Sequence, residues 1–510
     1  MAERARRLVA LDLGAESGRV AVGTFDGERL VVEDVHRFPN IPVALAGTLH
    51  WDFLRLFGEV AAGLRRAGSG GPVASIGVDT WGVDFGLLDA RGRLLANPVH
   101  YRDARTDGMP AAADALVPRT ELYRATGIQF MPINTLYQLL AMVRADDPLL
   151  RQADRLLMMG DLFAHFLCGS TVAEYTNAST TQLLDPRTRD WARPLAARFG
   201  IPERLLPEIV QPATVLGLLR GEVADAPGLT RTRVVASASH DTASAVVGAP
   251  LDGPSTAFLS SGTWSLLGLE VSGPVISDAS CAANLTNEGG VGGTIRLLRN
   301  VAGLWLVQET RRVLWPSGDP PAYEELAAMA ASAPAFTALV NPDDPRFLHP
   351  GDMPERIRAW CRETGQAVPG DAGTLLRVIL ESLALRYAAV LAELGQVAGV
   401  SVDAVRVVGG GANHRLLCQL TADATGLPVH AGPVEATLLG NLVVQAMALG
   451  EIPDVAAGRT SIARSLSTTT YEPRGDWSEQ RARFAALSHR PDDRPAAAVR
   501  HAPQSGGSRS

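Results

Sequence analysis

The chain contains no lysine, because all 47 residues of its combined lysine and arginine count are arginines. A P-loop needs a lysine on the nucleotide phosphates, and protein kinases need one on a strand beside the ATP. Enzymes that form a Schiff base need a lysine amine. The sequence therefore excludes these three classes, and any reaction with ATP has to use backbone amides, arginines, hydroxyl groups and a metal ion.

Cysteine is scarce as well. The four cysteines are scattered and form no C-x-x-C pair; they are Cys168, Cys281, Cys361 and Cys418. This spacing favours neither a zinc knuckle nor a dithiol motif. We expect four reduced thiols in a cytoplasmic protein.

Long apolar runs and an excess of positive charge are also absent. The formal net charge is −7, so no basic field attracts nucleic acid or an anionic membrane. Met1–Arg7 is charged, unlike a signal peptide. The most apolar run, Leu438–Leu449, is too short to span a bilayer and contains Asn441 and Gln445. We expect a cytoplasmic monomer or small homo-oligomer with neither nucleic-acid nor membrane partners.

What is present is a repeated local pattern. In the first half, strand-like Val9–Leu13 and Val20–Val22 flank a turn, and in the second half Thr256–Leu259 and Trp264–Leu267 do the same. Two such units indicate an internal duplication. Further strands are predicted at Leu30–Val32, Ser75–Asp79 and Val405–Val408, and helices at Arg386–Leu394, residues 416–424 and Leu438–Leu449.

Mixed strands and helices in a chain of 510 residues predict an α/β protein with two large domains. We expect the junction near Gly248–Pro254, with a first domain at residues 1–247 and a second at residues 248–489. Residues 490–510 are rich in Arg, Pro, Ala, Ser and Gly without apolar periodicity. This composition is typical of a disordered tail.

The first motif that could carry chemistry is the turn between Asp12 and Arg19. Its glycines allow the backbone to present amides to an anion, while Ser17 and Arg19 offer a donor and a positive charge. Asp12, at the carboxyl end of a strand, could hold the hydration shell of Mg²⁺. The alternative is a hairpin whose Asp and Gly serve only the turn.

The second motif is Ser239–Ala245, where a carboxylate precedes a run of small residues. Asp241 could accept the proton of an attacking hydroxyl, as a general base does in phosphoryl transfer. The alternative is an aspartate that caps an alanine-rich helix. His240 on its own is more typical of a packed or capping residue.

Three more segments have both functional and structural interpretations, and one of them, the triple glycine Gly409–Gly411, is not a G-x-G-x-x-G fingerprint. The turn Ser260–Thr263 could bind phosphate or be a plain hairpin, and Gly409–Gly411 could lie against a nucleotide. Thr80–Phe85 combines an aromatic ring, a glycine and a carboxylate, which suits a sugar. A buried tryptophan beside a turn explains that segment equally well.

Together and in this order, the motifs resemble those of the FGGY family of carbohydrate kinases, and within it the members that phosphorylate L-rhamnulose. The resemblance runs from about Leu8 to Leu449. Its segments are Thr80–Phe85, Tyr101–Thr106, Gly127–Leu139, Glu174–Leu183, Ala238–Val246, Leu259–Leu266, Leu285–Gly290, Gly303–Gln308, Val408–Gly411 and Ala431–Asn441. It implies a duplicated two-domain ribonuclease-H-like fold of the actin-type ATPase class, with the active site in the interdomain cleft.

The resemblance also implies roles for individual residues. The ATP contacts are Ala15, Glu16, Ser17, Gly18, Arg19, Thr263, Gln308 and Gly410. The sugar contacts are Gly82, His240, Asp241, Thr242 and Asn300. Asp241 is the expected catalytic base and Asp12 the expected magnesium carboxylate. Glu16 stands where some members have serine, so its side chain is given no role.

The expected reaction transfers the terminal phosphate of ATP to the primary hydroxyl of L-rhamnulose, with Mg²⁺ as cofactor and L-rhamnulose 1-phosphate as product. One alternative is the same chemistry on another ketose, such as L-fuculose or xylulose, which a panel of ketoses would distinguish. The other is an actin-like or chaperone-like protein, which sugar-independent ATP turnover would favour.

Overall fold

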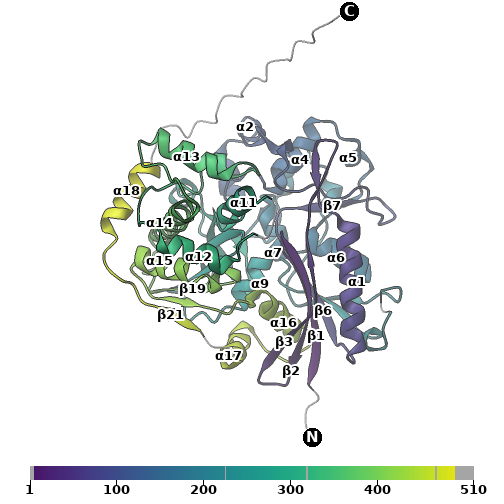
Figure 1. The fold of residues 1–510 in the computed structure, drawn as a ribbon. Coiled ribbons are helices and arrows are strands. Elements are labelled where there is room, and N and C mark those ends of the chain that lie inside the picture. Colours follow the sequence, from purple (N-terminus) through teal and green to yellow (C-terminus); the bar gives the residue numbers. More distant parts are fainter. Residues whose placement is uncertain (1–4, 224, 317–319, 466–467, 489–510) are drawn as a thin grey trace, which may run out of the picture.

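The computed structural model describes residues 5–223, 225–316, 320–465 and 468–488, and it has two halves that each contain a central sheet (Figure 1). The tail expected at residues 490–510 lies outside the described residues. Within the described ranges, no helix is long and apolar enough to cross a membrane.

The first sheet has six strands in the order β13-β14-β6-β1-β2-β3. Its central strand β1 pairs antiparallel with β2 and parallel with β6, and β6 pairs parallel with β14. The bounds are β1 (Arg6–Leu13), β2 (Ser17–Phe25), β3 (Leu30–Pro39), β6 (Ser75–Thr80), β13 (Thr214–Leu218) and β14 (Arg233–Ala236).

The second sheet has seven strands in the order β17-β18-β16-β15-β19-β20-β21. Here β15 pairs antiparallel with β16 and parallel with β19, as β1 does with β2 and β6. The bounds are β15 (Thr256–Ser261), β16 (Trp264–Val271), β17 (Thr286–Gly289), β18 (Ile295–Ala302), β19 (Ala404–Val408), β20 (Val429–Ala431) and β21 (Thr469–Tyr471). The matching order and direction confirm the predicted duplication.

Short two-stranded pairs complete the strands of the described ranges. They are β4 (Val43–Leu45) with β5 (Thr48–His50), β7 (Phe85–Leu88) with β8 (Arg155–Met158), β9 (Ala173–Glu174) with β12 (Ile209–Val210), and β10 (Leu184–Asp185) with β11 (Asp190–Trp191).

Helices surround both sheets (Figure 1). In the first half they are α1 (Phe53–Ser69), α2 (Met109–Asp114), α3 (Arg119–Thr126), α4 (Thr135–Arg144), α5 (Pro148–Gln152), α6 (Met159–Cys168), α7 (Tyr175–Ala178), α8 (Arg193–Arg198) and α9 (Asp241–Val247). In the second half they are α10 (Asp278–Ala282), α11 (Trp305–Leu314), α12 (Tyr323–Ser332), α13 (Met353–Glu363), α14 (Ala372–Ala398), α15 (Arg415–Thr425), α16 (Ala436–Ala448), α17 (Val455–Ser465) and α18 (Ser478–Ser488).

The apolar run of β1 is buried on both of its faces. Because successive strand residues point to opposite faces, Val9 and Leu11 pack in one cluster with α1, whereas Leu8 and Ala10 pack in another with α16. α1 suits its face because Leu56, Val60 and Leu64 recur every four residues. The continuous apolar strand read from the sequence is therefore explained by cover on both sides.

α16 belongs to the second half of the sequence but packs on the first sheet and crosses α9. The two helices approach closely at glycines: a Cβ added to Gly440 would lie 1.8 Å from the Ser244 carbonyl oxygen, and one added to Gly248 would lie 2.0 Å from that of Ala436. α16 thereby joins the two halves next to the cleft. The predicted helix Leu438–Leu449 corresponds to α16.

Candidate active site

A cavity of about 410 Å³ receives side chains from both halves of the chain. Residues before the expected junction that line it include Gly14, Ala15, Glu16, Ser17, Trp81, Gly82, Tyr101, Gln129, Thr180, His240, Asp241 and Thr242. Residues after it include Ser260, Ser261, Gly262, Thr263, Trp264, Thr286, Glu288, Asn300, Gln308, Gly409, Gly410 and Thr437. The mixture of glycines, hydroxyls, aromatic rings and a few charges suits a polar ligand.

The loop between β1 and β2 forms one edge of the cavity. It is closed by a hydrogen bond of 2.9 Å from the Gly14 amide to the Ser17 carbonyl. The side chain of Asn40 donates to the Gly14 carbonyl over 2.9 Å and fixes the entry to the loop. Glu16 and Ser17 remain exposed at the cavity. An anion could therefore reach this loop.

Directly beside the loop, Asp12 and Arg19 face each other across the β1–β2 ladder. The Asp12 Oδ2 atom accepts from Arg19 Nε over 2.8 Å and lies 2.7 Å from Arg19 Nη2. Arg19 also donates to Glu435. Burial alone would lower the pKa of Arg19, but the two carboxylates raise it above its ordinary value. Arg19 is thus a permanent cation engaged by acidic partners.

Asp79 is the last residue but one of the neighbouring strand β6 and lies next to Asp12 in the parallel ladder. It is fully buried, and burial together with the charges of Asp12 and Asp241 raises its pKa well above the ordinary value. Asn441 of α16 donates to Asp79 Oδ2 over 2.5 Å, while Oδ1 has no hydrogen-bond partner among the residues that the structure describes. The side chains of Asp12, Asp79 and Asp241 therefore lie close together, and Arg19 forms an ion pair with Asp12.

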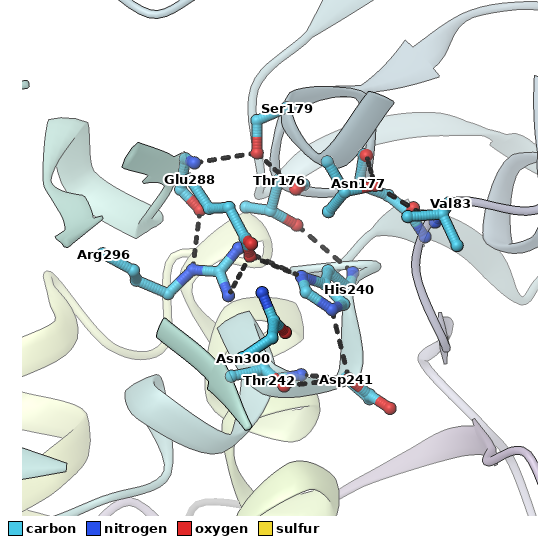
Figure 2. A network of polar contacts seen from close by, with 12 residues as sticks. Val83, Thr176, Asn177, Ser179, His240, Asp241, Thr242, Glu288, Arg296 and Asn300 are labelled. Carbon is cyan, nitrogen blue, oxygen red and sulfur yellow. Dashed lines mark hydrogen bonds and ion pairs between the residues drawn. The ribbon is translucent and has the colours of Figure 1, made fainter. Parts of the chain in front are cut away.

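Asp241 begins α9 on the floor of the cleft (Figure 2). Its Oδ1 atom accepts from the Thr242 amide over 2.5 Å and from Thr242 Oγ1 over 3.1 Å, and it lies 3.4 Å from His240 Nε2. Burial in the cleft, opposed by His240 and reinforced by Asp12, raises the pKa of Asp241. Because these donors converge on Oδ1, the Oδ2 atom is the one available to a ligand.

A second carboxylate, Glu174, holds the segment that precedes Asp241. It accepts from the Ser239 amide over 3.0 Å and from Ser239 Oγ over 2.6 Å. Thr176 donates to the same carboxylate and accepts from the His240 amide over 3.3 Å (Figure 2). These bonds fix the backbone that presents His240 and Asp241 to the cavity.

His240 connects the two halves through Arg296 and Glu288. Arg296 Nη2 lies 3.1 Å from His240 Nδ1, and Glu288 Oε2 lies 3.3 Å from the same nitrogen (Figure 2). Since a guanidinium group only donates, the contact with Arg296 favours the tautomer in which Nδ1 accepts and the ring proton is on Nε2. In this tautomer the proton faces Asp241 Oδ1.

Asn300 is held by a residue of the first half. Gln129 Oε1 accepts from the Asn300 amide over 2.8 Å and from Asn300 Nδ2 over 3.0 Å, and Gln129 Nε2 donates to the Asn300 carbonyl over 3.1 Å. Both side chains line the cavity. This three-bond clamp fixes the orientation of the Asn300 amide across the two halves.

Trp81 and Gly82 form another part of the wall, supported by the buried carboxylate of Asp84. Its Oδ2 atom accepts from the Trp81 indole over 3.0 Å and from the Trp51 indole over 2.6 Å. Burial raises the pKa of Asp84 to about 6, although these donors oppose the rise. A Cβ on Gly82 would lie 3.2 Å from Thr180 and 3.3 Å from His240, so glycine keeps this corner open.

Around the turn between β15 and β16, the second half contributes a neutral surface. Gln308 Nε2 donates to Thr263 Oγ1 over 3.3 Å, next to the turn between β15 and β16. Gly409 has a φ of 79°, a left-handed value that favours glycine. In the described part of the chain nothing lies within 4 Å of a Cβ added to Gly410, so its backbone faces open space in the cavity.

Most of the residues predicted from the sequence meet at this one cavity. Those that line it are Ala15, Glu16, Ser17, Gly82, His240, Asp241, Thr242, Thr263, Asn300, Gln308 and Gly410. Asp12, Gly18 and Arg19 are close in sequence but do not line it. The sequence did not single out Asp79, Gln129, Glu288 or Arg296, although the segments that resemble the family contain Gln129 and Glu288.

Comparison with known proteins gives the family. Residues 7–248 match the model of the N-terminal domain of the FGGY family of carbohydrate kinases, and residues 257–449 match the model of its C-terminal domain. The chain belongs to the FGGY family of carbohydrate kinases. The expectation of a carbohydrate kinase is thereby confirmed.

Among its relatives, a rhamnulokinase from Bacteroides thetaiotaomicron is 45% identical over 465 residues, which cover 91% of this chain and 95% of that protein. A rhamnulokinase from Pectobacterium carotovorum is 44% identical over 488 residues, covering 95% and 97%. A gluconate kinase from Lactobacillus acidophilus has a similar fold, with a TM-score of 0.77 at 19% identity and coverage of 95% and 96%.

Proposed function

We propose that the chain is an ATP-dependent kinase that phosphorylates L-rhamnulose at its terminal primary hydroxyl, giving L-rhamnulose 1-phosphate and ADP. Two relatives that are 44–45% identical along most of the chain carry the name rhamnulokinase. The observation that carries the reaction type is Asp241, with Oδ1 held by Thr242 and Oδ2 available, in a cavity shared by both halves.

In this proposal Asp241 is the general base. The sugar hydroxyl gives its proton to Oδ2 while its oxygen attacks the terminal phosphorus of ATP in line. The Thr242 amide and hydroxyl and the ring of His240 keep the carboxylate in one orientation. A preset base of this kind contributes by positioning as much as by basicity.

The amides of the β1–β2 loop and of the β15–β16 turn would bind the phosphates from opposite sides. Ala15 to Ser17 and Thr263 line the cavity, and Gly410 offers open backbone for the nucleoside. The predicted ATP contacts of Gly18 and Arg19 remain proposals, since Arg19 is bound to Asp12 and Glu435. Gly82, His240 and Asn300 would hold the sugar.

The residues around Asp12 fit a magnesium ion. Among the described residues the buried Asp79 Oδ1 atom has no hydrogen-bond partner, and Asp12 and Asp241 lie close enough for their negative charges to raise the pKa of Asp79. Within the described ranges no group of three or more metal-ligating side chains is preassembled. This suits Mg²⁺, which keeps several waters and binds substrate phosphates. When bound, it would neutralise charge on the phosphates, with Asp12 as the proposed carboxylate.

The reaction consumes ATP and a free ketose, so we place the enzyme in the cytoplasm. We also propose that it acts as a monomer or small homo-oligomer with small-molecule partners only. L-fuculose and xylulose are the alternative substrates. No observation on the cavity favours them over L-rhamnulose.

A ketose panel tests this proposal. ADP release is measured with L-rhamnulose, L-fuculose, L-xylulose and D-xylulose at equal concentrations, with and without Mg²⁺. We expect the highest kcat/KM for L-rhamnulose and no turnover in excess chelator. A higher kcat/KM for another ketose would contradict the substrate, and ATP turnover without any sugar would contradict the reaction.

A further inference from the structure

The cleft side of β17 carries two polar side chains whose roles are unassigned. Thr286 and Glu288 both line the cavity and are 0% and 4% exposed. Thr286 Oγ1 and Glu288 Oε2 are buried without a hydrogen-bond partner in the described part of the chain. A buried polar atom left unpaired is unfavourable by about 1–3 kcal/mol, so each of the two requires an explanation.

The unpaired state of Glu288 follows from the contacts of its neighbours. His240 Nδ1 accepts from Arg296 Nη2 and therefore has no proton for Glu288 Oε2, which lies 3.3 Å away. Arg296 Nη1 lies 3.1 Å from Oε2 as an ion pair, yet neither atom completes a hydrogen bond. The two atoms thus face each other as an ion pair, and each keeps the capacity to form a hydrogen bond (Figure 2).

The chemical group that satisfies both atoms is a hydroxyl. A hydroxyl donates one hydrogen bond and accepts others, so it can give its proton to Glu288 Oε2 and accept from Arg296 Nη1. A carboxylate or an ammonium group could satisfy only one of the two. The hydroxyl of Thr286 lies two residues away on the same strand face and can pair with a neighbouring hydroxyl. A polyhydroxylated ligand matches this pattern.

The charge of Glu288 strengthens the argument. Burial alone would raise the pKa of Glu288, but the positive charge of Arg296 holds it below the ordinary value. The side chain is therefore a carboxylate at neutral pH, and hydrogen bonds to a carboxylate are about twice as strong as neutral ones. Removal of one sugar hydroxyl should be costly at such a position.

The position of Glu288 relative to the base indicates which hydroxyls it can reach. The imidazole ring of His240 separates them, with Nδ1 3.3 Å from Glu288 Oε2 and Nε2 3.4 Å from Asp241 Oδ1. A hydroxyl bound to Glu288 is therefore not the one that gives its proton to Asp241. It belongs to a carbon farther along the sugar.

We propose that Glu288 and Thr286 bind hydroxyl groups of the ketose remote from the reacting one, and that Glu288 is a specificity-determining residue. The proposal rests on the proposed function, because it takes a ketose as the ligand. It adds a group of sugar contacts on β17 to those expected at Gly82, His240 and Asn300.

The test combines variants with substrates. Wild type, Glu288→Gln and Thr286→Val are assayed with L-rhamnulose and with analogues that lack the hydroxyl at C3, C4 or C5. For one analogue we expect wild type to lose about 10–100-fold in kcat/KM. Glu288→Gln should lose a similar factor with L-rhamnulose but little more with that analogue, since the contact is already gone. Thr286→Val should lose about tenfold in kcat/KM with L-rhamnulose. It should lose little more with the analogue that lacks the hydroxyl bound by Thr286.

Thr310→Val is the matched control. Thr310 Oγ1 is also buried without a hydrogen-bond partner, but this residue is on α11 and does not line the cavity. Its variant should leave kcat/KM unchanged for every sugar. Thr286→Val leaves the Glu288–Arg296 pair in place, so it carries the test if Glu288→Gln fails to fold.

Two outcomes would overturn the inference. Equal losses for all sugars would mean that Glu288 acts only through His240, and unchanged kcat/KM in both variants would mean that bound water satisfies these atoms. The proposed substrate is judged separately by the wild type. If the wild type prefers another ketose, wild type and variants are compared with that ketose and its deoxy analogues, and the same two outcomes would overturn the inference.

Discussion

The β1–β2 and β15–β16 hairpins occupy equivalent places in the two sheets but carry opposite kinds of side chain. Asp12 pairs with Arg19 and lies beside Asp79, whereas Ser260 pairs with Leu266 and lies beside Val408. The first hairpin thus concentrates charge, and the second offers a hydroxyl and apolar surface. The two sheets therefore share their strand order, but the charged side chains lie at the first hairpin and the neutral ones at the second.

This difference indicates which ligand groups each hairpin can bind. Charge beside the first hairpin suits phosphates and a cation, which interact strongly at short range. Neutral hydroxyls and open backbone in the second half suit a nucleoside, which carries no charge. Variants at equivalent positions of the two hairpins therefore test whether the charged and neutral contacts are divided in this way.

The largest effect is expected at the base. Asp241→Asn keeps an oxygen for the donors of Thr242 but replaces the proton-accepting Oδ2 with an amide. We expect turnover to fall by about 10²–10⁴-fold, with ATP affinity largely retained. Steady-state kinetics and calorimetric titration with ATP measure the two. Near-normal turnover would remove Asp241 from this role.

The pH profile gives an independent check on the same residue. Because the pKa of Asp241 is raised, the base becomes protonated, and activity falls, as the pH drops through a value above the usual one of 3.8. Activity should return as the pH rises. In Asp241→Asn this acid limb should vanish from the kcat profile, and an unchanged limb would point to another group.

The next effect compares equivalent positions of the two hairpins. Asp12→Asn should raise the Mg²⁺ concentration for half-maximal activity by about 10–100-fold, and excess Mg²⁺ should restore part of the activity. Ser260→Ala should leave that concentration unchanged. Magnesium titrations of both variants make the comparison, and equal shifts would contradict the assignment of charge to one hairpin.

Much of the fold and several residues of the site could be predicted from the sequence, because their signals are local. The strands around Asp12 and Ser260 are apolar segments bounded by turns, a local signal that does not depend on distant residues. Asp241 precedes a run of small residues, which is also local. The domain boundary near residue 248 stays a prediction, since the two family matches end at residue 248 and begin at residue 257.

The features that were missed depend on long-range contacts. Gln129 and Asn300 are 171 residues apart, so their clamp has no signature in a single sequence. Glu288 and Arg296 are typical strand residues until β17 and β18 place them beside His240. The sequence predicts that Arg19 contacts the phosphates of ATP. In the structure Arg19 forms ion pairs with Asp12 and Glu435, and the pair with Glu435 joins residues 416 positions apart, which a single sequence does not reveal.

A smaller effect contrasts two glycines of the second half. Gly440→Ala should lower the free energy of unfolding by about 1–3 kcal/mol, because its Cβ would clash with the Ser244 carbonyl. Alanine normally stabilises a helix relative to glycine, so a loss would report the α9–α16 crossing. Gly410→Ala meets open space and should leave stability unchanged. Thermal unfolding of both variants tests this, and equal melting temperatures would contradict it.

The smallest effect separates the two ligands. Gly410→Val should raise the KM for ATP by about tenfold by blocking close approach to the backbone, whereas Asn300→Ala should do the same for the sugar by removing an amide. Each variant should leave the other KM nearly unchanged. If both variants remain folded and raise both KM values equally, the assignment of Gly410 to ATP and of Asn300 to the sugar is wrong.

The position of α16 has a consequence for how the protein is made. Leu438, Leu442 and Val443 cover Leu8 and Ala10 of the first sheet, yet they are translated long after that sheet. A nascent chain that has emerged through α9 therefore presents an uncovered apolar face, a state prone to aggregation. Completion of the first half has to wait for residues 436–448. Chaperone demand during synthesis should then depend on the second half, and fragments that end before α16 should be poorly soluble.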